Sequence, residues 1–330
     1  MPRKGPLVAW LALIAGIGLQ AVVTALLGLS FTAADSLLML ALAAAVCTLI
    51  GAVAARGNRC TLLEHKQGVR ALVWLNVWTA ISFVAFFLGV GIHSAAVVFT
   101  LEASFAPLVV TAWAVVRVHR GDDQARPGPA QGWAASLLAV LGTSLVVVMA
   151  QSDSGGMISF LAAALLGVIA GVAAGGVVIV SRGLGGAGVG VVQVMAHRFY
   201  ATVIFAAIVL LTLVPYGLLA PPVLNIGVIG AAALTCLVAP LFLLQYGMQR
   251  LTPLSVTAAL ATMPAITIAI ELASGRPVSW IILFLGLLIV PANLALLVTQ
   301  RPELTLSRLS LLRTTLFDTE HRTQPAVTTV

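Results

Sequence analysis

The chain alternates between long apolar runs and short polar stretches. The apolar runs are about 20 residues or longer and contain few charged side chains. A helix of about 20 apolar residues crosses a hydrocarbon core of about 30 Å. The pattern predicts ten membrane-spanning helices, at residues 7–29, 34–55, 71–92, 95–116, 131–150, 158–181, 191–217, 225–248, 252–273 and 277–298.

The fold class follows from this pattern. Helices satisfy all their own backbone hydrogen bonds in lipid, and the alternating runs of about ten residues that a barrel needs are absent from the sequence. Composition adds that the chain is not a water-soluble domain, because 61% of its 330 residues are hydrophobic and 8% are charged. Soluble chains carry about 25% charged residues. We therefore expect an all-α, polytopic membrane helix bundle.

The distribution of basic residues predicts the orientation. On a ten-span path, 16 of the 17 lysines and arginines fall on the side of the N-terminus, and Arg276 is the exception. Basic loops stay in the cytoplasm, so both termini are predicted to be cytoplasmic, in a multi-pass protein of the cell (inner) membrane. The net charge of +7 forms no basic stripe with interleaved aromatic residues, which argues against a nucleic-acid partner.

The two halves of the sequence resemble each other. Residues 93–107 (HSAAVVFTLEASFAP) and 250–264 (RLTPLSVTAALATMP) each open a span rich in small and hydroxyl residues and end on a proline. Five spans are an odd number, so a second copy of five enters the membrane in the opposite direction. The expected architecture is two inverted five-helix repeats, which many secondary transporters use for alternating access.

With these paired segments, the sequence resembles the drug/metabolite transporter superfamily, specifically its ten-span group with two EamA-type repeats. The resemblance also rests on the run QYGMQRLTPLSVTAAL at 245–260 and on Arg198. The resemblance implies one repeat at 1–150 and a second at 151–299. It also implies a secondary-active transporter, most simply an exporter of an amino-acid-like or amine-bearing metabolite. Residues 300–330 form a cytoplasmic tail, predicted to be an amphipathic helix at 303–317 and disordered from Asp318.

Glu102 is the most informative polar residue in the predicted spans. It lies about eight residues into its span, or about 10 Å from the outer end at 1.5 Å per residue. An ionised carboxylate facing lipid there costs several kcal/mol, so we expect it to face the bundle interior. It is then a proton-coupling or cation-binding group, a neutral acid bonded to a neighbouring hydroxyl, or an acid that reaches the outer water; we favour the first.

Other polar side chains at helical spacing share faces that either line a cavity or bond to neighbouring helices. Asn76, Thr79 and Ser82 form one such face, and Thr100 and Ser104 form another. Arg198, at the cytoplasmic end of its span, is either an anion-binding group or a positive-inside anchor. The predicted pathway residues, including two aromatic residues for stacking and two prolines that remove helix hydrogen bonds, are Asn76, Trp78, Thr79, Thr100, Glu102, Ser104, Pro107, Arg198, Gln245, Tyr246, Thr257, Pro264 and Glu271.

Three function classes remain to be weighed. A transporter is favoured, and with no GxxxxGK[ST] loop in the sequence it would run on gradients, including a proton gradient. A membrane enzyme would need acidic or histidine clusters in longer loops, and a structural or signalling protein would need a larger soluble part. We expect no cofactor and no metal. The lipid bilayer and a small-molecule substrate are the expected partners. The glycines at 167, 171 and 175 allow close packing within a monomer or between two copies.

Overall fold

The computed structural model describes residues 6–27, 31–56, 66–93, 95–119, 128–152, 156–223, 225–273 and 280–298. Helices make up the ordered elements of these ranges, and no strand occurs in them. Seven helices are, by length and composition, able to cross a membrane. The expected all-helical fold class is confirmed at this level. The tail at 300–330 and Arg276 lie outside the described residues.

The first six helices are continuous and match the first six predicted spans to within about five residues at each end. In these six helices, Pro107 of α4 is the one proline that lies beyond the first residue of its helix. The helices are α1 (Pro6–Leu27), α2 (Ala33–Ala54), α3 (Lys66–Ile92), α4 (Ala95–His119), α5 (Pro129–Ser152) and α6 (Met157–Gly186).

The sequence predicted unbroken helices for the next three spans, but in the structure these spans are interrupted. The segment 191–217 is divided at Arg198, the segment 225–248 contains a π-helical turn, and the segment 252–273 is divided at residues 261–262. The pieces are α7 (Val191–His197), α8 (Tyr200–Leu213), α9 (Ile226–Ala233), η2 (Leu234–Val238), α10 (Ala239–Arg250), α11 (Pro253–Leu260) and α12 (Met263–Ala273), followed by α13 (Trp280–Val298).

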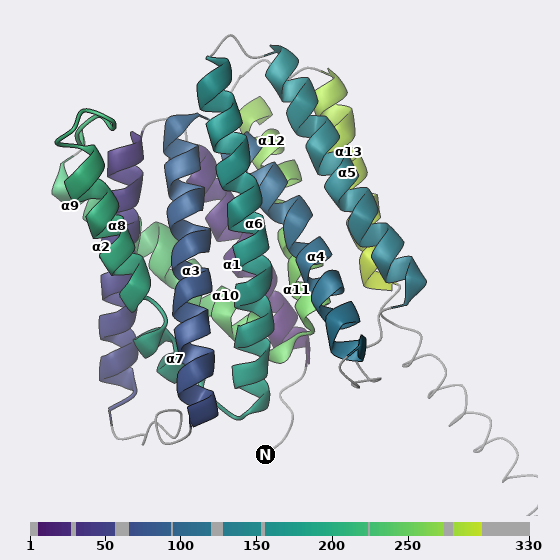
Figure 1. Cartoon of the computed structure of the whole chain (residues 1–330), viewed down its shortest axis with the longest axis horizontal. Coiled ribbons are helices and arrows are strands. Elements are labelled where there is room, and N and C mark those ends of the chain that lie inside the picture. The colour runs from purple at the N-terminus through teal and green to yellow at the C-terminus, as the bar shows by residue number, and fades with distance from the viewer. Residues whose placement is uncertain are drawn as a thin grey trace, which may run out of the picture.

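The helices form one bundle. Helices α3, α6 and α4 lie side by side, with α5 and α13 at one edge and α2, α8 and α9 at the other (Figure 1). A large apolar core joins the centre to the α2 edge. A smaller cluster that includes Leu145, Ile289 and Leu296 holds α5 against α13. Apolar side chains gain little free energy when they move from lipid into the bundle, because lipid tails are also apolar. Tight packing between helices therefore has to stabilise this arrangement.

Glycines of α6 provide such packing. A Cβ at Gly171 would lie 2.7 Å from the backbone oxygen of Glu102, and Gly167 and Gly175 meet α4 at similarly short distances. Spaced four residues apart, the three glycines lie on one helical face, so the backbones of α4 and α6 approach closely. The structure thus uses this face for packing within the chain, and it fixes the depth of Glu102 in the bundle.

The start of α2 is fixed by its own sequence. Thr32 caps the helix by accepting a hydrogen bond from the Asp35 amide, and the Asp35 carboxylate accepts in return from the Thr32 amide at 3.0 Å. This reciprocal pair is a capping box. The second carboxylate oxygen of Asp35 accepts from the Val223 amide at 3.0 Å, which ties the start of α2 to the segment between α8 and α9.

Candidate functional site

A cavity lies at the centre of the bundle. It has a volume of about 60 Å³ and is lined by α1, α3, α4, α6, α10, α11 and α12 and by the break between α7 and α8. Most of its lining is apolar, including Phe83 and Phe99. Its polar lining residues are Gln20, Ser82, Glu102 and Arg198. A mostly apolar hollow with a few convergent polar groups has the composition of a small-molecule site.

Glu102 lies on the wall formed by α4. Its side chain is half-buried and borders the cavity, as expected from the cost of exposing a carboxylate to lipid. Within the described part of the chain, no hydrogen bond or ion pair involves the Glu102 carboxyl group. The carboxyl group is therefore available to a proton, a cation or a substrate amine in the cavity.

Arg198 is the second charged residue of the cavity. It is 1% exposed and lies in the break between α7 and α8. The sequence interpretation had instead placed it at the cytoplasmic membrane surface. Its Nε donates to Thr79 Oγ1 at 3.1 Å, and its Nη1 donates to Gln245 Oε1. The guanidinium carbon lies 5.2 Å from the Phe199 ring centroid.

Among the described residues, no carboxylate forms an ion pair with Arg198. A guanidinium carries five N–H donors, and the two hydrogen bonds to neutral side chains use only part of them. Gln245 is fully buried, and its Nε2 has no hydrogen-bond partner within the described ranges. A buried cation beside an unused amide donor can bind an anionic group, because such a cation is costly unless it is paired.

Asn76 of α3 holds the break itself. Its Nδ2 donates to the His197 carbonyl at the end of α7, at 2.6 Å, and to the Leu72 carbonyl of its own helix, at 3.1 Å. Its Oδ1 accepts from the Ala201 amide in the first turn of α8, at 3.3 Å. One side chain thus satisfies a backbone group on each side of the interruption, which an interrupted helix in lipid requires.

The two predicted prolines occupy different positions. Pro107 is buried inside the continuous helix α4, and without an N–H it leaves the carbonyl of Ala103 without its usual helix partner. Ala103 lines the cavity. Pro264 is the second residue of α12, directly after the break, where its missing N–H costs no helix bond.

The remaining predicted residues lie outside the cavity lining. Thr100, Ser104 and Thr257 each donate to a carbonyl of their own helix, at 2.7, 2.6 and 3.1 Å. The Tyr246 ring lies 3.6 Å below the Arg250 guanidinium, and Trp78 faces Gly176 in a second hollow. Glu271 is in α12, and its side chain lies outside the described residues.

Three of the lining residues that sequence reasoning did not single out are Phe83, Phe99 and Gln20. Phe83 and Phe99 are apolar residues in apolar spans, so no sequence signal separates them from core positions. Gln20 is a strongly polar residue within the run 7–29. Ser82 was predicted on the polar face with Asn76 and Thr79, and it is the member of that face that lines the cavity. The polarity of Gln20 is the signal that could have identified it.

Comparison with known proteins adds a fold match. No family model and no curated protein matches the sequence. A solved structure titled "Crystal structure of protein" has a TM-score of 0.59 and 16% identity, covering 90% of this chain and 97% of that chain. The likeness therefore extends over nearly the whole helix bundle, and at this identity it concerns the fold alone.

Proposed function

We propose that this chain is a secondary-active transporter of the cell (inner) membrane that exports a small organic metabolite, with the architecture of an EamA-type drug/metabolite transporter. The observation that carries the proposal is the central cavity, whose mostly apolar wall holds Glu102 and the buried Arg198. An amino-acid-like solute carries both an amine and a carboxylate, so its charges complement these two side chains.

The packing pairs support an inverted repeat of five helices. Helices α3 and α4 both pack on α6, and their proposed counterparts, α10 and α12, both pack on α1. Helix α5 packs on α13, which is its own proposed counterpart. Exchanging the two halves therefore maps these contacts onto one another. A two-fold relation of this kind places a substrate site near the middle of the membrane, between the repeats.

The broken helices support the location of the pathway. The breaks at Arg198 and at residues 261–262 both border the cavity, since Arg198, Leu260 and Met263 all line it. Irregular backbone is tolerated at membrane depth where it is covered by protein or borders a cavity. Such breaks also let one part of a helix move relative to the other during alternating access.

In the proposed mechanism, Glu102 exchanges a proton or a cation and Arg198 binds the anionic end of the solute. Protonation of Glu102 removes its attraction for a substrate amine, so proton binding and amine binding compete at one carboxylate. Arg198 stays charged, because a guanidinium keeps its proton in proteins. Rearrangement of the helices around the cavity then opens it alternately to the two sides of the membrane.

The test is a proteoliposome assay with purified protein and an enclosed pH dye. Pools of amino acids, amines, nucleosides and lipophilic cations are added across an imposed proton gradient. We expect one pool, amino acids or amines, to evoke proton movement, and Glu102→Gln to abolish it. Glu64→Gln, the same change outside the predicted spans, is expected to leave it unchanged. Flux of a transported pool that is equal in the wild type and in Glu102→Gln at every pH would refute the coupling role.

A further inference from the structure

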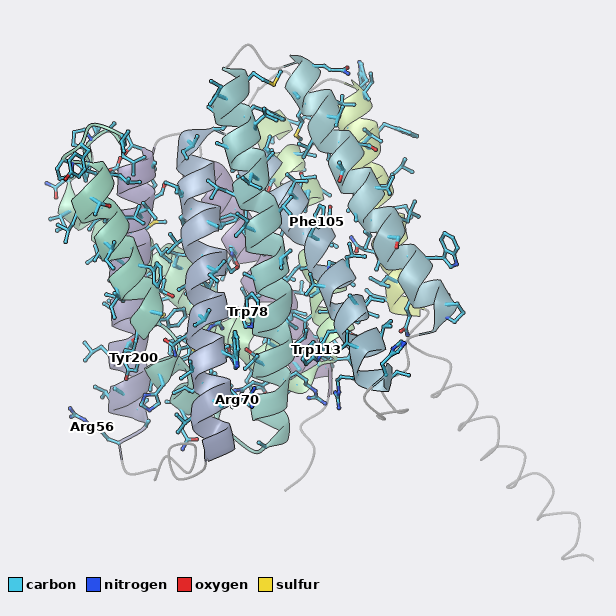
Figure 2. The ribbon with its side chains drawn as sticks, in the orientation of Figure 1. Arg56, Arg70, Trp78, Phe105, Trp113 and Tyr200 are labelled. Atoms are coloured by element: carbon cyan, nitrogen blue, oxygen red, sulfur yellow. The ribbon has the colours of Figure 1, made fainter. Side chains whose placement is uncertain are left out.

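A second hollow lies on the outer face of the bundle, and we call it the α3–α4 groove. It has a volume of about 660 Å³ and is lined by α3, α4 and α6. Its lining is almost entirely apolar, and three tryptophans contribute to it, Trp74, Trp78 and Trp113. In Figure 2, Trp78 and Trp113 lie on opposite sides of α6, with Arg70 nearer the start of α3.

The walls of the α3–α4 groove are held in place by packing. A Cβ at Gly176 of α6 would lie 2.8 Å from the Trp78 indole, so the glycine provides the space in which this ring rests. Trp74 stacks on Trp78 with ring centroids 6.0 Å apart and an interplanar angle of 24°. Trp74 and Trp113 keep more than two fifths of their surface exposed, so they project as rims and do not fill the hollow.

Basic side chains flank one end of the groove. Arg70 lines it and lies four residues, about one helical turn, before Trp74. Arg117 lies four residues after Trp113 on α4. Since α3 starts and α4 finishes at the same end of the bundle, both exposed arginines lie beyond the tryptophans in the same direction. Tryptophan followed by arginine is the order typical of a helix that leaves the hydrocarbon for the headgroup layer.

We propose that the α3–α4 groove binds an anionic glycerophospholipid of the adjacent leaflet, the cytoplasmic leaflet in the proposed orientation. One acyl chain lies over α6 between the tryptophan rims, and the phosphate is bound at Arg70. The site is separate from the central cavity, and the proposal does not depend on transport.

Two physical arguments select this occupant. A hollow with an apolar lining that faces hydrocarbon is filled by acyl chains, because leaving it empty would forfeit dispersion contacts along its walls. Arg70, the basic residue that lines the groove, then favours a headgroup with net negative charge over a zwitterionic one by about 1 kcal/mol, or about fivefold. A second copy of the chain would instead exclude every lipid from the groove.

The test uses tryptophan fluorescence. A background variant with Trp10→Phe, Trp133→Phe and Trp280→Phe keeps only the three groove tryptophans of the six in the chain. It is reconstituted into vesicles that contain brominated phosphatidylglycerol or brominated phosphatidylcholine, whose bromine atoms quench nearby indoles. We expect an apparent relative affinity about fivefold higher for phosphatidylglycerol. Equal quenching by both lipids, or protection from both as in a dimer interface, would overturn the proposal.

Two variants locate the binding. Arg70→Gln is expected to abolish the fivefold preference, whereas Arg56→Gln, an exposed arginine at the same end of the bundle and outside the groove, is expected to keep it (Figure 2). Ala112→Phe places a ring in the groove and is expected to reduce quenching by both lipids. A loss of preference that is as large in Arg56→Gln as in Arg70→Gln would assign the effect to general surface charge and reject the site.

Discussion

Helix α4 runs unbroken through Pro107, whereas its proposed counterpart is divided into α11 and α12 just before Pro264. The same contrast is seen along the chain. Its first six helices are continuous, and the next three apolar segments are interrupted. A proline is therefore neither sufficient nor necessary for a break, since α7 and α8 separate at Arg198 without one. Both breaks lie beside the central cavity, which the continuous helices α1, α3, α4 and α6 also line.

The difference shows what a break in lipid requires. Each interruption leaves backbone groups without helix partners, and in hydrocarbon no water satisfies them. At the α7–α8 break Asn76 supplies the partners from α3, and at the α11–α12 break the Thr262 hydroxyl donates to the Ala259 carbonyl at 2.7 Å. The interior of a continuous helix needs no such help. The breaks are thus specified by side chains on other helices or at the helix ends.

The largest expected effect comes from removing the side chain that bridges a break. Asn76→Leu leaves the His197 carbonyl and the Ala201 amide without their partner, and each unsatisfied buried group costs about 1–3 kcal/mol. We expect a loss of about 3 kcal/mol in the free energy of unfolding, measured by denaturant titration in detergent.

The matched control for Asn76 is Asn293, in the continuous helix α13. It is 1% exposed, and among the described residues neither of its side-chain polar atoms has a hydrogen-bond partner. Asn293→Leu removes two unpaired buried groups and is expected to leave the protein as stable or more stable. Equal losses in the two variants would mean that Asn76 acts by shape and that its hydrogen bonds do not maintain the break.

A smaller effect is expected at two threonines, one in α3 and one in α4. Thr79 and Thr100 are both fully buried, but Thr79 accepts from the Arg198 guanidinium, while Thr100 donates only to its own helix. Hydrogen bonds to charged groups contribute about 1.5–3 kcal/mol. Thr79→Val is expected to lower the free energy of unfolding by about 2 kcal/mol, and Thr100→Val by less than about 0.5 kcal/mol. A thermal-unfolding series in one detergent compares them, and a reversed order would show that Arg198 does not need Thr79.

The sequence predicted the positions of the helices better than their continuity. Hydropathy averages over about 20 residues, so it located segment 191–217 correctly and could not register a break of two residues within it. That break depends on Asn76, which is distant in sequence. For the same reason Arg198 was predicted at the membrane surface: its position was counted from the start of an unbroken span, whereas the structure buries it.

Within the site, single-residue chemistry was more informative than shared faces. Glu102 was predicted inside the bundle from the cost of exposing its charge, and it lines the cavity. Thr100 and Ser104 share a face, as helical periodicity requires, but their hydroxyls bond within α4. A polar face of hydroxyl residues has this local alternative, so periodicity does not distinguish a cavity wall from a helix contact.

The smallest expected effect returns to the two prolines. Pro107→Ala supplies an N–H that can bond to the Ala103 carbonyl within a helix that is already continuous, and alanine is the better helix former by up to about 3 kcal/mol. The surrounding packing recovers only part of this, so we expect a gain of about 1 kcal/mol in the free energy of unfolding. Pro264→Ala adds an N–H in the first turn of α12, where no helix carbonyl can accept it, and its effect is expected to stay below about 0.5 kcal/mol. Denaturant titration of both variants measures the difference. A gain at Pro264 as large as that at Pro107 would mean that α11 and α12 join into one helix once the proline is gone, and that the proline, not the cavity, maintains the break.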